Sequence, residues 1–171
     1  MAVVFVLLVI FVAICGTGVF FGAPFVPTRK IWIDQALDLA KISAKDVVVD
    51  LGSGDGAVLL SAAIRGAKKA VGYEINPLLV LWSRIRISMR GRKISRKIHI
   101  EQGNFFAKNL PSDTTVIYLF QVNKIMKRIP SFIRENRAKF AVNDLKVVCF
   151  GFELPGEKIV AKNNGMFLYE F

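Results

Sequence analysis

The sequence predicts an α/β fold in which a mostly parallel sheet ends in an antiparallel hairpin and is preceded by one transmembrane helix. Residues 47–51 are β-branched or apolar apart from one aspartate, and glycines follow at alternate positions, which is typical of a buried parallel strand turning into a helix. Strand-like and helix-like segments alternate after it. Residues 2–21 carry no charge and, at ~1.5 Å per residue, can cross a hydrocarbon core of ~30 Å.

The apolar N-terminus is predicted to be a retained membrane anchor. It lacks the basic start of a signal peptide, and Arg29 and Lys30 are the first charged residues of the chain. The positive-inside rule then places the folded part on the cytoplasmic, or matrix-equivalent, side of a membrane. A buried core helix or a cleaved targeting sequence is the alternative. We expect a single-pass anchor over residues 1–23, a connector over 24–30 and one domain over 31–171.

The connector and the first elements of the domain follow from local signals. Pro24 and Pro27 exclude a continuous helix, so the connector is either a plain linker or a segment that folds over a ligand. Apolar residues at helical spacing predict a helix over residues 31–41. The first strand is expected at 46–51, and the next helix at 57–66, with a glycine as its stop.

The turn after the first strand is suited to a ligand. Gly52, Gly54 and Gly56 can adopt positive φ and let the backbone approach a ligand closely, and Asp50 stands at the carboxyl end of the strand, where open α/β sheets bind ligands. The spacing also satisfies a loose dinucleotide fingerprint, so a nicotinamide or flavin cofactor is an alternative. Asp50 and Asp55 would repel a pyrophosphate but attract a ligand that carries an ammonium and a sulfonium.

The second strand, residues 70–75, brings Glu74 to the same edge of the sheet. A carboxylate at this place can accept both hydroxyl protons of a ribose. Asn76 and Pro77 are a strong helix start, as N-cap and first helical residue. We therefore expect a helix over 77–90.

A basic run lies at the end of that helix and beyond it. Seven Lys and Arg residues, and no acid, occur between residues 84 and 97, in a chain with a net charge of +11. Beside a membrane anchor, the run is predicted to contact anionic lipid headgroups, with a partner protein or RNA as alternatives. Nucleic acid is disfavoured because no aromatic residue is interleaved with the cations after Trp82.

The rest of the chain supplies three more parallel strands and the closing hairpin. Strands are expected at 98–102, 115–120 and 145–152, a basic helical stretch broken near Pro130 at 123–140, and hairpin strands at 158–162 and 166–171 around Asn163-Asn164-Gly165. Cys15 and Cys149 are far apart in apolar surroundings, which indicates neither a disulfide nor a zinc framework, and no metal site is predicted.

The segment Asp50-Leu51-Gly52-Ser53-Gly54-Asp55-Gly56 resembles the first motif of class I S-adenosylmethionine-dependent methyltransferases. The predicted strands fit their Rossmann-like sheet. The resemblance implies S-adenosyl-L-methionine as cofactor and places Asn104 and Phe105 at its adenine, with asparagine instead of the usual aspartate. The end of the fourth strand, residues 119–123, lacks the Asn/Asp-Pro-Pro-Tyr/Phe signature of enzymes that methylate amino groups of nucleic acids.

A narrower resemblance covers most of the chain. The apolar N-terminus, residues 24–28, the glycine motif, residues 72–77 and Trp82-Ser83-Arg84 together resemble the small membrane-anchored protein-lysine methyltransferases of mitochondria, which modify the ATP synthase c subunit or the adenine nucleotide translocase and have prokaryotic relatives. This resemblance implies a membrane-associated protein substrate. The residues expected at the cofactor are Asp50, Gly52, Ser53, Gly54, Asp55, Gly56, Glu74, Asn104, Phe105 and, as part of a cap, Thr28.

The predicted chemistry is direct displacement of the sulfonium methyl by a neutral amine, which needs alignment more than a general base. A lysine must first lose its proton, and desolvation favours this. No base is assigned. Tyr118 and Gln121 are the polar candidates at the end of the fourth strand, where the methyl acceptor is expected, and the alternative for each is a packing role. Methylation of a lipid or quinone-like molecule is the alternative, followed by a non-catalytic nucleoside-binding adaptor.

Overall fold

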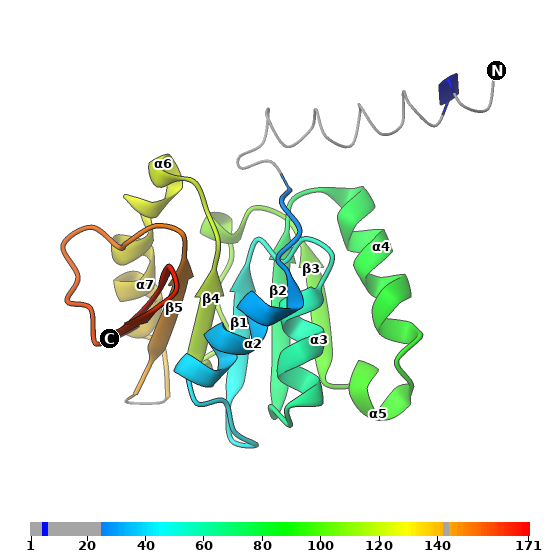
Figure 1. Cartoon of the computed structure of the whole chain (residues 1–171), viewed down its shortest axis with the longest axis horizontal. Helices are drawn as coiled ribbons and strands as arrows, with labels where there is room; N and C mark the ends of the chain where they lie inside the picture. The colour runs from blue at the N-terminus through cyan, green and yellow to red at the C-terminus, as the bar shows by residue number, and fades with distance from the viewer. Residues whose placement is uncertain (1–4, 7–24, 142–143) are drawn as a thin grey trace.

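The computed structural model describes residues 5–6, 25–141 and 144–171, and its centre is a seven-stranded sheet covered by helices on both faces (Figure 1). The strand order is β3-β2-β1-β4-β5-β7-β6. The strands are β1 (Val47–Leu51), β2 (Lys69–Glu74), β3 (Ile98–Gln102), β4 (Val116–Leu119), β5 (Lys146–Phe150), β6 (Ala161–Asn163) and β7 (Met166–Glu170).

The first five strands run parallel, and β7 lies antiparallel between β5 and β6. This confirms the predicted α/β fold with a mostly parallel sheet and a C-terminal antiparallel hairpin. Asn164 and Gly165 form the hairpin turn with φ of 46° and 78°, as the Asn-Asn-Gly signal requires. No helix among the described residues is long and apolar enough to cross a membrane, and the predicted anchor, apart from residues 5 and 6, lies outside those residues.

Helices fill the connections between the strands. They are α2 (Lys30–Leu39), α3 (Ala57–Ile64), α4 (Pro77–Ser88), α5 (Arg92–Ser95), α6 (Asn123–Met126) and α7 (Ile129–Arg137), with a short 3₁₀ helix, η1 (Phe105–Ala107). The sequence predicted neither α5 nor η1, which are too short for a periodic pattern. The predicted break in the basic helical stretch falls at residues 127–128, and Pro130 stands in the first turn of α7, where proline costs no hydrogen bond.

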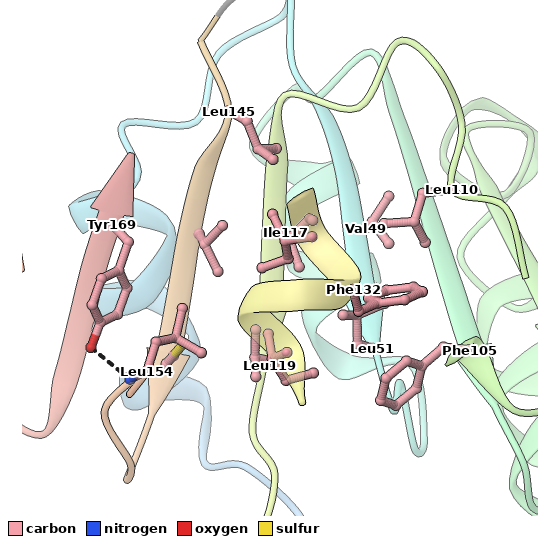
Figure 2. Packing of buried hydrophobic residues seen from close by; sticks show 14 of the residues in the cluster. Val49, Leu51, Phe105, Leu110, Ile117, Leu119, Phe132, Leu145, Leu154 and Tyr169 are labelled. Atoms are coloured by element: carbon pink, nitrogen blue, oxygen red, sulfur yellow. Dashed lines mark hydrogen bonds between the residues drawn. The ribbon is translucent and has the colours of Figure 1, made fainter. Parts of the chain in front are cut away.

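Two apolar cores lie on opposite faces of the sheet. On one face α7 packs Phe132 and Ile133 against Ile117 of β4, and the Tyr169 hydroxyl accepts the N–H of Leu154 at 2.9 Å (Figure 2). On the other face α2 and α3 cover the sheet, and Leu37 of α2 belongs to a core with Val48 of β1 and Val116 of β4. Because β1 and β4 are buried on both faces, their carboxyl ends are fixed in position, and the candidate site is built there.

Candidate active site

A cavity of about 920 Å³ opens at the carboxyl ends of β1, β2 and β4. All but one of the residues predicted for the site line this cavity. They are Thr28, Asp50, Gly52, Ser53, Gly54, Asp55, Glu74, Asn104, Phe105, Tyr118 and Gln121. The exception is Gly56. The topology of a parallel sheet therefore brings together residues that are far apart in the chain.

The glycine turn is held by backbone hydrogen bonds to β2. The N–H groups of Gly52 and Ser53 both donate to the carbonyl of Tyr73, each at 2.9 Å. Gly52 has φ +102°, and a Cβ there would lie 2.2 Å from Gln121 Nε2, so no other residue fits without displacing that side chain. The turn is thus a rigid part of the cavity wall.

Glu74 joins the end of β2 to this turn. One carboxylate oxygen accepts the N–H of Gly54 and the other accepts the N–H of Asn76, both at 2.8 Å. A carboxylate has about four acceptor positions, so two of them are left for a ligand. Glu74 lines the cavity and can address a ribose there while it also fixes the turn.

Asp50 is a buried acidic side chain without a partner among the described residues. Only 2% of its surface is exposed, and none of the described residues forms a hydrogen bond or ion pair with its side chain. Burial raises the pKa of Asp50 well above its ordinary value, and the neighbouring carboxylates of Glu74 and Asp55 raise it further. A ligand that carries positive charge would relieve this cost, and the ammonium and sulfonium of S-adenosylmethionine fit that requirement.

Asp55, which was predicted to attract such a ligand, has a partner within the protein. Its carboxylate forms an ion pair with Arg86 of α4 and accepts the N–H of Ala57 at 3.2 Å. The charge of Asp55 is therefore largely balanced within the protein, although the residue lines the cavity. Of the two aspartates, Asp50 is therefore the one without an ion-pair partner among the described residues.

Gly56 also has a different place from the one expected. It adopts φ +75° as the N-cap of α3, and its α-carbon faces α4, where a Cβ would lie 3.3 Å from Ser83 Cβ and 3.4 Å from Ile87 Cδ1. The third glycine thus allows close packing of the turn against α4. It is absent from the cavity lining.

Asn104 and Phe105 follow β3 at the cavity rim. The Asn104 carbonyl oxygen caps η1 by accepting the N–H of Phe106 at 3.0 Å, which leaves its amide N–H₂ for a ligand. Phe105 is buried and packs against Phe106 with ring centroids 4.4 Å apart. Phe106, which the sequence reasoning missed, is the more open ring of the two and carries the Arg128 guanidinium 4.0 Å above its centroid.

The connector folds over the glycine turn. Phe25, Val26 and Thr28 line the cavity, and the Phe25 ring lies so close to Gly54 that a Cβ there would be 2.6 Å from it. Of the two interpretations left open by the sequence, the structure favours the segment that covers a ligand. Most residues of the connector are also exposed to solvent, so it covers the cavity with a single layer of chain.

The two polar candidates at the end of β4 have different environments. Gln121 donates its amide N–H to the carbonyl of Leu51 at 2.7 Å, so it supports the strand end next to the glycine turn. The Tyr118 hydroxyl is buried and forms no hydrogen bond of good geometry with any described residue, although an interaction with the Thr28 side chain offsets part of the rise in its pKa. Burial, and next the charge of Asp50, raise the pKa of Tyr118, so the hydroxyl is protonated at neutral pH.

Six more residues line the cavity that were not singled out one by one from the sequence, although Phe120 and Val122 fall within residues 119–123, the predicted end of the fourth strand. Four apolar residues and two cations line it on the side of β4, β5 and α6. They are Phe120, Val122, Ile125, Phe152, Lys124 and Arg128. They lie in loops or short helices that follow strand ends, and only their position after β4 and β5 could have indicated them.

The fold and this site define a class I S-adenosylmethionine-dependent methyltransferase. A family model described as the ANTKMT methyltransferase domain matches residues 50–161, and the chain belongs to this family. S-adenosylmethionine is its cofactor. The site fits this molecule, because an unpaired buried carboxylate, a glycine turn and free acceptor positions on Glu74 meet in one cavity.

Individual relatives agree with this assignment. A protein-lysine N-methyltransferase of Saccharolobus islandicus is 32% identical over 134 residues, which cover 78% of this chain and 79% of that protein. A human lysine N-methyltransferase of the ATP synthase c subunit is 30% identical over 132 residues, 77% of this chain but 53% of the relative, so the chain spans about half the length of that protein.

A solved structure shows the same fold with a cofactor product in place. An RNA methyltransferase from Salinibacter ruber, in complex with S-adenosyl-L-homocysteine, superposes with a TM-score of 0.75 and 28% identity, and the match covers 85% of this chain and 92% of that one. The seven-stranded sheet is thus shared with a methyltransferase that binds this product.

Proposed function

We propose that this enzyme methylates the ε-amino group of a lysine in a membrane-associated protein, and that residues 1–23 anchor it in the membrane in a single pass. The folded domain then lies on the cytoplasmic or matrix-equivalent side, with the basic run at residues 84–97 near anionic headgroups. The relatives named as protein-lysine N-methyltransferases support the choice of lysine.

The observation that carries the proposal is the position of the connector relative to the cavity. Phe25 and Val26 are the first described residues after the apolar N-terminal segment, and both line the cavity that binds the cofactor. A membrane-embedded segment would therefore end within a few residues of the active site. A substrate lysine at the membrane surface is then within reach of the cavity mouth.

The residues of the cavity suit an amine acceptor. When bound, S-adenosylmethionine supplies a methyl group on a sulfonium, which a neutral amine displaces directly. The apolar side chains of Phe120, Val122 and Phe152 line the cavity and would exclude water from an entering lysine, which lowers the pKa of its ammonium and favours the neutral form. The protonated Tyr118 hydroxyl can accept an N–H of that amine through its oxygen and hold the nitrogen in line for attack.

The test is to incubate the purified full-length protein with native membranes and S-adenosylmethionine carrying a labelled methyl group. We expect the label in protein, on lysine side chains identified by mass spectrometry after digestion. Label that extracts with organic solvent and leaves the protein fraction unlabelled would instead assign the activity to a lipid or quinone-like acceptor. Label on other side chains would refute lysine as the acceptor.

The anchor is tested separately. After cell fractionation, the full chain is expected in the membrane pellet, resistant to extraction by high salt and by alkaline carbonate. A variant that lacks residues 1–23 should become soluble and still bind the cofactor. Recovery of the full chain in the soluble fraction would contradict the anchor without affecting the assignment of the cofactor.

A further inference from the structure

Helix α4 is apolar on two opposite sides. Val80 and Ile87 are buried against α3 and the sheet, and the buried Leu79 lines the cavity. On the other side Leu78, Leu81, Trp82, Ile85 and Met89 are exposed, with Trp82 at 56% and Met89 at 79%. At about 100° per residue, these five side chains occupy a stripe roughly 100° wide that runs along the whole helix. We call them the outer stripe.

A contiguous row of large apolar side chains is unusual on a soluble surface and marks a contact with a partner or a membrane. None of the described residues covers the outer stripe, since its members are exposed while the inner residues account for the packing of α4 on the domain. The outer stripe is thus free to contact a partner or a membrane outside the described residues.

The charges around the outer stripe select an anionic surface. Arg84 and Arg86 flank it on either side along the helix, although Arg86 is already paired with Asp55. Arg90, Arg92, Lys93 and Arg96 follow at its C-terminal end. The last four are exposed, and no described acidic residue forms an ion pair with any of them. An apolar stripe bordered by arginines is the pattern of a helix that lies in the plane of a membrane interface.

The path of the chain agrees with this. Helix α4 begins at the carboxyl edge of the sheet, and the connector enters at that same edge (Figure 1). There the Phe25 ring lies against Gly54. Pro77, the first residue of α4, lines the same cavity as Phe25 and Val26. The described connector therefore begins, at Phe25, at the end of the molecule where the outer stripe starts.

We infer that the outer stripe of α4 lies in the headgroup and upper acyl region of an anionic leaflet, with α4 parallel to the membrane plane. This inference rests on the proposed membrane function and adds an orientation to it. The domain contacts the bilayer along the side that carries α4 and α5, and the cavity mouth opens along the membrane surface. Its acceptor is then a lysine at headgroup depth.

The experiment measures the depth of Trp82 in the bilayer. The chain has two tryptophans, and Trp32, which stacks on Phe150, is changed to phenylalanine so that Trp82 is the only one. The full-length Trp32→Phe protein is reconstituted in vesicles of phosphatidylcholine with phosphatidylglycerol. We expect a blue shift of Trp82 emission relative to detergent solution, loss of most of the emission when the acyl chains are brominated, and protection from aqueous acrylamide.

Two further variants of the Trp32→Phe protein test whether the basic residues and the outer stripe bring α4 to the membrane. Changing Arg90, Arg92, Lys93 and Arg96 together to glutamine should weaken quenching by brominated lipid severalfold, as should omission of phosphatidylglycerol. Leu81→Ser should lower the methylation rate of a membrane-embedded substrate severalfold while cofactor affinity stays unchanged. The matched control is Ile64→Ser, an equally exposed residue at the end of α3, which should change neither property.

The outcomes separate this inference from the proposed anchor. If the protein floats with the vesicles but Trp82 is as accessible to acrylamide as in detergent, the anchor holds and the orientation is refuted. If the protein does not float, the anchor itself fails. Protection of Trp82 in detergent that increases with protein concentration would assign the outer stripe to a second copy of the chain and also refute the inference.

Discussion

The carboxylate of Glu74 accepts the backbone N–H of Gly54 at 2.8 Å, so the glycine turn after β1 is held by the last residue of β2. The second oxygen of the same carboxylate accepts the N–H of Asn76. A residue expected only to contact the ribose is thus also part of the scaffold. Substitutions of Glu74 will affect the shape of the cavity as well as its contacts.

The first prediction follows from this double role. In Glu74→Gln the amide N–H₂ must face one of the two backbone N–H groups, since both carboxylate oxygens accept one. We expect cofactor affinity to fall at least about tenfold, or ~1.4 kcal/mol, and the ligand-free protein to lose about 1–3 kcal/mol of stability. Isothermal titration and thermal unfolding measure the two effects.

The control for that variant is Glu101→Gln, the same chemical change at a partly exposed ion pair with Lys108 outside the cavity. It should leave the affinity unchanged and alter stability by less than about 1 kcal/mol. If Glu74→Gln behaved like this control, the carboxylate would not be needed for either role.

The second prediction concerns pH. Because the pKa of Asp50 is raised in the folded protein, the native state holds a proton that the unfolded chain releases above its ordinary pKa of 3.8. The stability of the ligand-free protein should therefore decrease as pH rises through the window between that value and the raised pKa. Asp50→Asn should remove this decrease and raise the melting temperature at neutral pH, while cofactor affinity falls at least about tenfold.

Thermal unfolding of the ligand-free protein at several pH values, compared with Asp113→Asn at the surface, checks the stability effect. For the wild-type protein, cofactor binding should release a proton in the same pH window, because a cation favours the ionised carboxyl. An Asp50→Asn protein that is less stable than the wild type at neutral pH would show that the Asp50 charge is balanced.

The third prediction tests the contact between the connector and the glycine turn. Gly54→Ala places a methyl group 2.6 Å from the Phe25 ring, at a φ of +52°. We expect displacement of Phe25 and at least a tenfold loss of cofactor affinity, in addition to about 1 kcal/mol of backbone strain. Gly66→Ala is the matched control, because it also has a positive φ, of +104°, but no atom within 4 Å of the added Cβ.

Titration calorimetry distinguishes the two glycines. Gly66→Ala should cost about 1 kcal/mol of stability and leave affinity unchanged. Equal affinities for the two variants would mean that the contact between Phe25 and Gly54 has no part in binding.

The fourth prediction addresses Tyr118. Since its hydroxyl has no hydrogen-bond partner among the described residues, Tyr118→Phe should leave stability unchanged or slightly higher. If the hydroxyl orients the acceptor amine, kcat falls about tenfold, or ~1.4 kcal/mol in the barrier, while the Kd of the cofactor stays the same. Tyr73→Phe loses a hydrogen bond to the carbonyl of Asn109 and should show the reverse pattern: stability falls by about 1 kcal/mol, and kcat is unchanged.

A steady-state assay with a labelled methyl group and a melting curve are sufficient for this comparison. An unchanged kcat in Tyr118→Phe would leave that residue with a packing role only. Because burial keeps the hydroxyl protonated, the rate of the wild-type enzyme should show no dependence on a tyrosinate at neutral pH.

The parts of the fold that the sequence predicts are those with a local cause. The run of β-branched residues at 47–49, the glycines after it and the cap formed by Asn76 and Pro77 each determine an element without help from distant residues, and the corresponding strands and helices are within a few residues of the expected bounds. Short elements such as α5 have no such pattern, because four residues make barely one helical turn.

The parts of the site that the sequence missed depend on distant partners. The pairing of Asp55 with Arg86 joins residues 31 positions apart, and nothing near Asp55 indicates it. The same holds for Gly56, whose neighbour Ser83 lies on the next helix. Asn104 was expected at the adenine, and its carbonyl oxygen also caps η1, which only the fold shows. The sequence thus predicted which polar residues gather at the site, but not which of them are already paired with other parts of the protein.

The walls of the cavity come from both ends of the described chain, from Phe25 to Phe152. A nascent chain that has left the ribosome as far as β3 already contains the glycine turn and Glu74, but it lacks β4, the second neighbour of β1 in the finished sheet. Cofactor binding should therefore begin only late in synthesis. Residues 1–23 are synthesised well before the chain can bind any cofactor.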